Sequence, residues 1–145
     1  MTQKTALFPG SFDPFTSGHE AIVQRALALF DHIVVAVGVN TDKKYMFTSQ
    51  QRMQKIRDSF PNDSRVEVVE YSDMTVDLCK RVGAHFILRG IRNTKDLEYE
   101  QTIAAVNKAL APDIETVLLL ADDKHRDISS TLIREQLAHQ QKETD

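Results

Sequence analysis

A continuous apolar run at residues 33–39, Ile-Val-Val-Ala-Val-Gly-Val, constrains the fold of this chain more than any other segment. A strand with one solvent-exposed face alternates apolar and polar side chains, whereas an unbroken apolar run is typical of a strand that is buried on both faces. Such strands occur in parallel sheets that are covered by helices on both sides. The run therefore predicts a central strand of a parallel sheet.

Strand and helix patterns alternate along the rest of the chain. Thr48, followed by Gln51, is typical of a helix start, and Gly83 is typical of a helix end. This alternation predicts an α/β fold, namely a single-domain, Rossmann-like, doubly wound sheet of five parallel strands with flanking helices. The expected strands are residues 6–8, 33–39, 66–71, 85–88 and 116–121, and the expected helices are residues 19–30, 48–60, 75–82, 93–110 and a last helix from about residue 128.

Composition limits the classes of function. The 145 residues fit one domain, 1–145, which is long enough to bury a core. A formal net charge of −3 argues against a surface built for nucleic-acid phosphates, and the single cysteine, Cys79, suits a reducing compartment. The N-terminus lacks the apolar region of a signal peptide, and no apolar run is long enough to cross a bilayer. We therefore expect a cytoplasmic protein without membrane or nucleic-acid partners.

The segment 7–22 predicts an anion site. A short strand breaks at Pro9, and a compact loop with two glycines leads into a helix. The first N–H groups of a helix have no partner within the helix and bind anions such as phosphate, and glycine lets a ligand approach the backbone. His19 stands where this helix begins. A lone histidine near a helix end is more often structural, but Ser11 and the glycines accompany this one, so we interpret His19 as a binding residue.

Further charged residues follow later strands, at the edge where open α/β sheets bind ligands. Lys43 and Lys44 lie in the loop after the second strand, where contact with a phosphate and simple solvation fit the sequence equally well. Arg89 and Arg92 stand at the end of the fourth strand and offer two planar donor groups to phosphate oxygens. Glu100, early in the next helix, fits equally a favourable interaction with the helix dipole and hydrogen bonds from a ribose.

Three hydroxyl residues, Ser129, Ser130 and Thr131, stand at the start of the last expected helix. One Ser or Thr is enough to cap a helix, so three in a row predict a second group of contacts for phosphate oxygens. By spacing, the chain has neither a Ser-His-Asp arrangement nor a cluster of zinc ligands.

These motifs resemble known signatures. The segment 10–19, Gly-Ser-Phe-Asp-Pro-Phe-Thr-Ser-Gly-His, resembles the T/HxGH signature of the nucleotidyltransferase superfamily, and residues 128–134, Ile-Ser-Ser-Thr-Leu-Ile-Arg, resemble its second signature, ISSTxxR. The segments 89–92 and 99–100, with Asn107, narrow the resemblance to the phosphopantetheine adenylyltransferase family. It covers nearly the whole chain and implies transfer of the adenylyl group of ATP to 4′-phosphopantetheine, with Mg²⁺, to give dephospho-coenzyme A and pyrophosphate.

The resemblance also implies roles for individual residues. His19 would bind the α-phosphate of ATP and stabilise the transition state. Lys43 and Arg89 would hold the phosphate of the acceptor, and Ser11 and Thr75 would be further substrate contacts. The residues expected to bind ATP are Ser11, Phe12, His19, Gly90, Ile91, Arg92, Glu100, His125, Arg126, Asp127, Ile128, Ser129, Ser130 and Thr131.

The resemblance further implies that Mg²⁺ arrives with ATP rather than on protein ligands, that the chain forms a homohexamer, and that coenzyme A is a candidate feedback ligand. Two other functions stay open: another transferase of the superfamily, such as a nicotinamide mononucleotide adenylyltransferase, and a module that binds ATP without turnover. Thr16 in place of the first histidine of HxGH, together with the segment 89–92, favours pantetheine. An acceptor phosphate is already an anion, so this reaction needs alignment and charge neutralisation rather than a general base.

Overall fold

Five parallel strands in the order β3-β2-β1-β4-β5 form the sheet of the computed structural model, which describes residues 3–122 and 129–144. The strands are β1 (Thr5–Gly10), β2 (His32–Gly38), β3 (Val66–Tyr71), β4 (Phe86–Ile91) and β5 (Glu115–Leu120). The prediction of an α/β fold with five parallel strands is confirmed.

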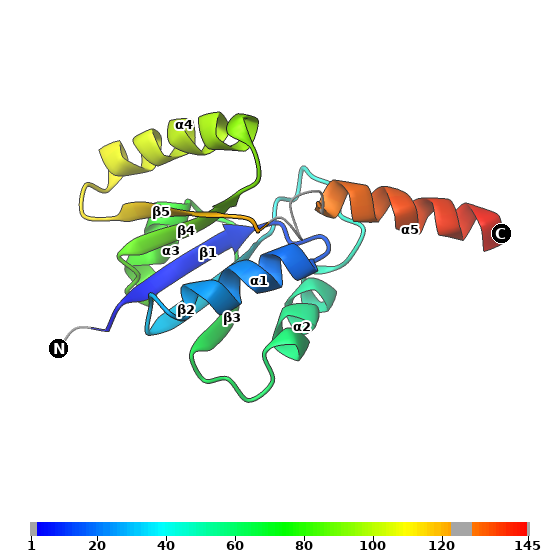
Figure 1. Cartoon of the computed structure of the whole chain (residues 1–145), viewed down its shortest axis with the longest axis horizontal. Helices are drawn as coiled ribbons and strands as arrows, with labels where there is room; N and C mark the ends of the chain where they lie inside the picture. The colour runs from blue at the N-terminus through cyan, green and yellow to red at the C-terminus, as the bar shows by residue number, and fades with distance from the viewer. Residues whose placement is uncertain (1–2, 123–128, 145) are drawn as a thin grey trace.

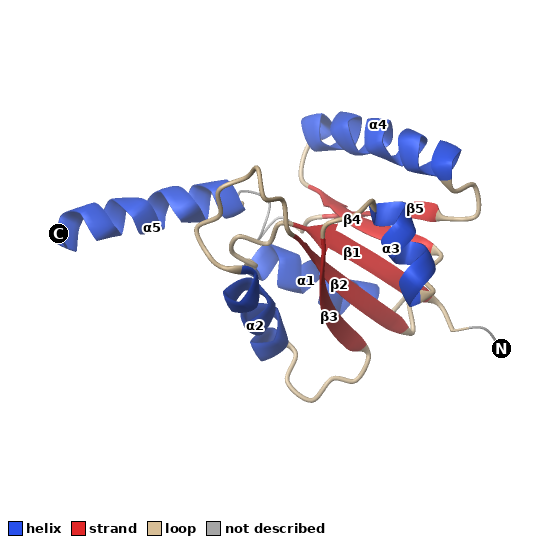
Figure 2. Cartoon of the chain, turned by 180° about the vertical axis from the view of Figure 1, so that it is seen from behind, coloured by secondary structure: helices blue, strands red, loops and turns tan. Residues whose placement is uncertain are grey.

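Helices cover both faces of this sheet. The helices α1 (Ser17–Ala26) and α2 (Ser49–Ser59) pack against one face, where Figure 1 shows α1 in front of the strands. The helix α3 (Thr75–Val82) and the turn after α4 (Thr94–Leu110) pack against the other face, which Figure 2 shows from behind. Alternate residues of β2 belong to the two cores, and all five residues at 33–37 are fully buried. The apolar run is therefore a central strand, as predicted.

The strand order places a topological switch point between β1 and β4. The chain runs outward from β1 through β2 to β3 and then returns to the other side of β1 to form β4. Loops after two such strands leave in opposite directions, which opens a crevice at their carboxyl ends. The β1–β4 ladder pairs only Ala6 with Phe86 and Leu7 with Ile87. Pro9 follows, and since proline has no N–H group it cannot donate a ladder hydrogen bond to a neighbour.

Helix ends agree with the sequence at several positions. Thr48 and Gln51 form the capping box of α2, and Gly83 ends α3 in the left-handed region at φ 73°. The first helix differs, because α1 begins at Ser17 with Thr16 as its cap and ends at Ala26 rather than near residue 30. The chain turns at residues 27–29 to enter β2.

The fourth strand is longer than expected. We predicted residues 85–88, but β4 continues to Ile91 because its pairing with β5 continues there, with Arg89 opposite Leu118 and Gly90 opposite Leu119. Arg89 is therefore held on a strand rather than in a loop. A strand fixes the position of its side chains more tightly than a connecting loop does.

The last helix, α5 (Ser130–Thr144), extends away from the carboxyl edge of the sheet, as both whole-chain views show (Figures 1 and 2). Among the described residues, two hydrogen bonds attach its first turns to the loop after β1: Ser130 Oγ donates to the carbonyl of Pro14 at 2.9 Å, and Arg134 Nη1 donates to the carbonyl of Asp13 at 2.7 Å. Of the helices in the described ranges, none has the length and apolar character that crossing a membrane requires.

Candidate functional site

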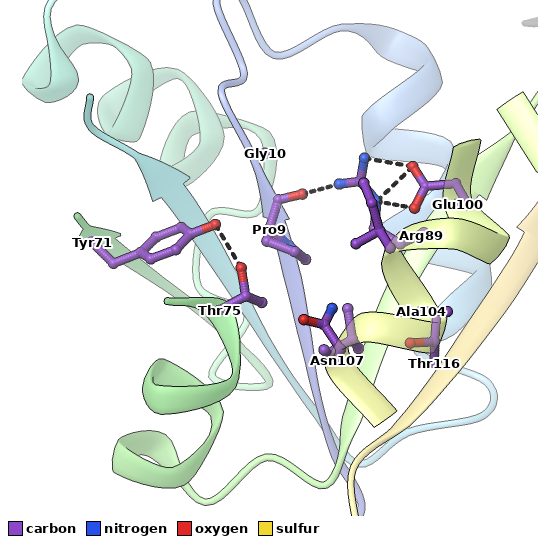
Figure 3. Close-up of a pocket in the computed structure, with 11 residues that line it drawn as sticks. Pro9, Gly10, Tyr71, Thr75, Arg89, Glu100, Ala104, Asn107 and Thr116 are labelled. Carbon is purple, nitrogen blue, oxygen red and sulfur yellow. Dashed lines mark hydrogen bonds and ion pairs between the residues drawn. The ribbon is translucent and has the colours of Figure 1, made fainter. Parts of the chain in front are cut away.

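Two adjoining cavities open at the switch point. The larger one, of about 350 Å³, lies between the loop after β1, the end of β4 and the start of α5. The smaller one, of about 160 Å³, lies between β1, β4 and α4 and reaches Tyr71 and Thr75 (Figure 3). The residues that line both cavities are Pro9, Gly10, Arg89 and Glu100.

The larger cavity brings together three segments that are far apart in the sequence. Most of the described residues that we expected to bind ATP line it, whereas Ile91 is buried and does not. The expected residues His125, Arg126, Asp127 and Ile128 lie outside the described part of the chain. Those that line the cavity are Ser11, Phe12, His19, Gly90, Arg92, Glu100, Ser129, Ser130 and Thr131.

The residues expected to contact the acceptor lie around the smaller cavity and its entrance. Thr75 lines the smaller cavity, and its Oγ1 is 3.3 Å from the hydroxyl of Tyr71. Arg89 stands between the two cavities. Lys43 lines neither of them, but its Nζ donates to Ser11 Oγ at 3.3 Å and so lies at the edge of the larger one.

His19 is held by the cap of its own helix. The backbone N–H of Thr16 donates to His19 Nδ1 at 2.9 Å, and His19 N donates to Thr16 Oγ1 at 3.3 Å. A backbone N–H can only donate, so Nδ1 must accept, and the proton of the neutral ring lies on Nε2. The ring stacks on Phe15 at a centroid distance of 5.4 Å and meets the edge of Phe12 at 5.0 Å. His19 therefore presents an N–H donor in a fixed orientation.

The imidazole of His19 is neutral at pH 7. Burial first, and then the positive charges of Arg89 and Arg92, lower its pKa from 6.5 to about 4. Each of these disfavours the protonated ring. The ring thus acts as a neutral hydrogen-bond donor, while the two arginines carry the positive charge of the cavity.

Gly10 is required by the packing of Phe12. A Cβ at position 10 would lie 2.9 Å from the Phe12 ring, which is closer than real side chains approach. Phe12 itself has φ 48°, in the left-handed region that non-glycine residues seldom adopt. Its ring also packs edge-to-face against Phe8 and Phe15, at 5.1 and 5.4 Å. This aromatic cluster supports the loop that carries Ser11.

Arg89 and Glu100 form a partly buried ion pair between the cavities. Arg89 Nε donates to both carboxylate oxygens at 3.0 Å, Nη2 donates to Oε1 at 2.8 Å, and Nη1 donates to the carbonyl of Pro9 (Figure 3). Glu100 is only 4% exposed, so its charge requires this partner. Within the described part of the chain, one N–H on each Nη nitrogen is left for a ligand. Neither of the roles that we weighed for Glu100 included this ion pair.

The three hydroxyls at the start of α5 have different partners. Ser129 Oγ accepts from Leu132 N at 3.1 Å and so caps the helix, and Thr131 Oγ1 accepts from Arg134 Nη2 at 3.0 Å. Ser130 Oγ donates its proton to the carbonyl of Pro14. A hydroxyl has one proton to donate, and within residues 3–122 and 129–144 no acceptor takes that of Ser129 or Thr131, so both can donate to a ligand in the larger cavity.

The donors around the cavities suit phosphate oxygens rather than a metal ion. Within the ranges that the structure describes, no group of three or more His, Cys, Asp or Glu side chains is placed to hold a metal. Mg²⁺ prefers phosphate oxygens and water to cages made only of protein ligands.

Sequence reasoning missed two buried charged residues beside the site. Asp13 is 3% exposed and Arg52 is 2% exposed. The helical pattern of α2 contained a signal for Arg52, because residue 52 lies on the same buried face as Met53 and Ile56. A charge on the core face of a helix requires specific partners.

Comparisons with known proteins agree with the fold and the motifs. A family model described as cytidylyltransferase-like matches residues 7–136. The chain is 48% identical over 136 residues to a phosphopantetheine adenylyltransferase from Flavobacterium johnsoniae, a match that covers 94% of this chain and 89% of that protein. It is 49% identical over 130 residues to another from Leuconostoc citreum, covering 90% of this chain and 82% of that protein.

Solved structures share the fold at low sequence identity. A bifunctional NMN adenylyltransferase/ADP ribose pyrophosphatase from Francisella tularensis matches with a TM-score of 0.71 and 17% identity, over 93% of this chain and 42% of that chain. A second structure of such a protein from the same organism, complexed with AMP and Mn ion, matches with a TM-score of 0.67 and 17% identity, over 93% of this chain and 41% of that chain. At this identity the likeness shows the fold alone.

We expect His19 to titrate near pH 4 rather than near 6.5, with the proton of the neutral ring on Nε2. Two-bond ¹H–¹⁵N correlation spectra over a pH series would measure both, with His19→Ala to assign the signal. A midpoint near 6.5, or a neutral ring protonated on Nδ1, would contradict the geometry. Because the unfolded chain takes up this proton at the ordinary pKa, the same burial should lower the free energy of unfolding as the pH falls from about 6.5 to about 4.

Proposed function

The chain belongs to the cytidylyltransferase-like family and, within it, to the phosphopantetheine adenylyltransferases, and from this we propose that it transfers the adenylyl group of ATP to 4′-phosphopantetheine. The products are dephospho-coenzyme A and pyrophosphate. One structural observation carries the proposal: His19 of α1, the two arginines at the end of β4 and the hydroxyls at the start of α5 line one cavity, which adjoins a second at Arg89.

Each cavity suits one substrate. The larger cavity has the cations, N–H groups and hydroxyls that a triphosphate requires, and we assign ATP to it. The smaller cavity has apolar walls at Ile87, Ile103 and Ala104, with polar groups at Thr75 and Asn107. This lining suits the flexible amide chain of pantetheine better than the ribose of a nucleotide acceptor. The acceptor phosphate then lies at Arg89, beside the cavity of the α-phosphate.

This placement supports an in-line displacement. An oxygen of the acceptor phosphate forms a bond to the α-phosphorus of ATP, and the bond from that phosphorus to pyrophosphate breaks. The nucleophile is already anionic, so the protein must align it and neutralise charge. His19 Nε2–H donates to an α-phosphate oxygen as its charge increases, and Lys43, Arg89 and Arg92 offset the charge of the phosphates. A divalent ion bound by the nucleotide would stabilise the charge of the leaving pyrophosphate.

We also propose Mg²⁺ as the divalent ion, a cytoplasmic location, coenzyme A as a feedback ligand and assembly as a homohexamer. One face of α4 supports the assembly, because it exposes apolar side chains at spacings of four, three and four residues. The four side chains are Tyr99, Ile103, Val106 and Leu110. Sedimentation velocity of the purified chain would measure the number of subunits.

Incubation with ATP and one acceptor at a time tests the proposed reaction. We expect pyrophosphate with 4′-phosphopantetheine and none above background with nicotinamide mononucleotide, because the smaller cavity is mostly apolar. Pantetheine without its phosphate is the matched control and should be inactive, since it lacks the nucleophile. Turnover of nicotinamide mononucleotide would favour the other transferase, and ATP binding without pyrophosphate from any acceptor would favour a non-catalytic module.

Substitution of His19 tests its role in the transition state. We expect His19→Ala to lower kcat by about a hundredfold or more, which is the usual cost of losing one donor to a developing oxyanion. His85→Ala, at an exposed histidine before β4, should leave kcat unchanged. Circular dichroism would verify that both variants are folded. Near-normal turnover of His19→Ala would refute the assigned role.

Substitution of Arg89 tests the position of the acceptor phosphate. Arg89→Lys keeps a positive charge beside Glu100 but loses the planar pair of donors. We expect the acceptor KM to rise about tenfold, the scale of one charge-assisted hydrogen bond, with a smaller effect on the KM for ATP. Arg65→Lys, at an exposed arginine paired with Asp63, is the control. An unchanged acceptor KM would remove Arg89 from the acceptor site.

A further inference from the structure

The carboxylate of Asp13 accepts hydrogen bonds from a loop on the other side of the site. Its Oδ2 accepts from Met46 N at 2.8 Å, and its Oδ1 accepts from Phe47 N at 2.9 Å. Both donors lie in the segment between β2 and α2, more than thirty residues along the chain. Asp13 is 3% exposed, and a buried carboxylate is stable only where hydrogen bonds replace its water. Asp13 thus connects the loop after β1 to the loop after β2.

A second set of contacts holds the same loop through Tyr45. The guanidinium carbon of Arg52 lies 4.0 Å from the ring centroid of Tyr45, and the hydroxyl of Tyr45 accepts from Asn40 N at 3.0 Å. Arg52 Nη1 donates to the carbonyls of Ser11 at 2.8 Å and Gly38 at 3.0 Å. The loop 39–48 is therefore attached at residues 45–47 to Asp13 and Arg52, and Tyr45 in turn holds the start of the loop through Asn40.

Lys43 lies between Asn40 and Tyr45, which a hydrogen bond within the loop joins. It is exposed, and yet its Nζ donates to Ser11 Oγ at 3.3 Å. A lysine side chain on a free loop loses much conformational entropy when it meets a ligand, whereas a loop that is already held in place loses less. Attachment of the loop therefore favours contact between Lys43 and an anion at Ser11.

We propose that Asp13 is a positioning residue for the acceptor, which holds the loop 39–48 so that Lys43 meets the acceptor phosphate. This inference rests on the function proposed above. The side chain of Asp13 touches the acceptor-side loop, whereas its carbonyl accepts from Arg134 of α5. A substitution of the side chain therefore acts on the acceptor side and leaves the attachment of α5 in place.

The variant Asp13→Asn distinguishes a positioning role of Asp13 from a direct effect of its negative charge on the acceptor phosphate. The amide keeps the shape, but its NH₂ group faces a backbone donor, so one of the two hydrogen bonds is lost. Removal of a negative charge near a phosphate should by itself lower the acceptor KM. The positioning role requires the opposite: the acceptor KM rises about tenfold, while kcat and the dissociation constant of ATP change by less than about threefold.

Asp42→Asn is the matched control. It removes a negative charge from the loop 39–48 itself, at an exposed position, and its acceptor KM should stay unchanged or fall slightly. If Asp13→Asn does not fold, Tyr45→Leu tests the same loop through its second set of contacts, since it removes the ring on Arg52 and the acceptor for Asn40. Tyr45→Leu should also raise the acceptor KM selectively.

A double-mutant cycle with Lys43→Ala gives the decisive readout. If Asp13 acts through Lys43, then Asp13→Asn should add less than about twofold to the acceptor KM of Lys43→Ala, although each single change raises it about tenfold. Independent effects would multiply to about a hundredfold, and this result would overturn the proposal. An equal rise in the dissociation constant of ATP, or no change in the acceptor KM, would overturn it as well.

Hydrogen exchange of the apo protein distinguishes failure of this inference from failure of the proposed function. The amides of Met46 and Phe47 should be protected in the parent chain and should exchange faster in Asp13→Asn, with no change in Asp42→Asn. Lack of turnover in the parent chain would refute the proposed function. Hydrogen exchange would still show whether Asp13 holds the loop 39–48. Unprotected amides in the parent chain would refute the attachment itself, whatever the turnover.

Discussion

The geometry of the site depends on how far β1 pairs with its two neighbours. β1 pairs with β2 along its whole length but with β4 at only two residues. Parallel strands that separate at their carboxyl ends leave backbone groups that require other partners. The carbonyl of Pro9 accepts a hydrogen bond from the guanidinium of Arg89, which also donates to Glu100. Because the β1–β4 ladder is incomplete, the carboxyl ends of the two strands leave a space for ligands. The ion pair of Arg89 and Glu100 lies between the two cavities of this space.

Buried polar groups hold the loops around this space before a ligand arrives. Thr16 orients the ring of His19, Glu100 holds Arg89, and Asp13 and Arg52 attach the loop that carries Lys43. Burial of these groups would cost stability without a partner. Among the described residues, Arg52 Nε is the one fully buried side-chain nitrogen or oxygen that lacks a hydrogen-bond partner. Groups that are already ordered lose less entropy on binding, which suits a reaction that depends on alignment.

The prediction of the fold succeeded where patterns are local. The apolar run at 33–39 indicated a central strand, and Thr48 and Gly83 marked helix ends correctly. The prediction was wrong where pairing with a distant strand decides where an element ends. The fourth strand continues to Ile91 because β5, which comes much later in the chain, supplies its hydrogen bonds. Likewise, no local pattern distinguishes the ion pair of Glu100 from a contact with the helix dipole.

The sequence by itself determined the order of strands and helices, the residue types that suit phosphate chemistry, and the family, because these follow from short-range periodicity and contiguous motifs. Only the tertiary structure decided which of these residues meet. Arg52 reaches a carbonyl 41 residues earlier, and Arg134 reaches one 121 residues earlier. Such contacts depend on strand order and on the length of the β1–β4 ladder, and spacing along the chain does not carry this information. The physical reason is that a buried charge takes its partner from whatever backbone the packed sheet brings within hydrogen-bond distance.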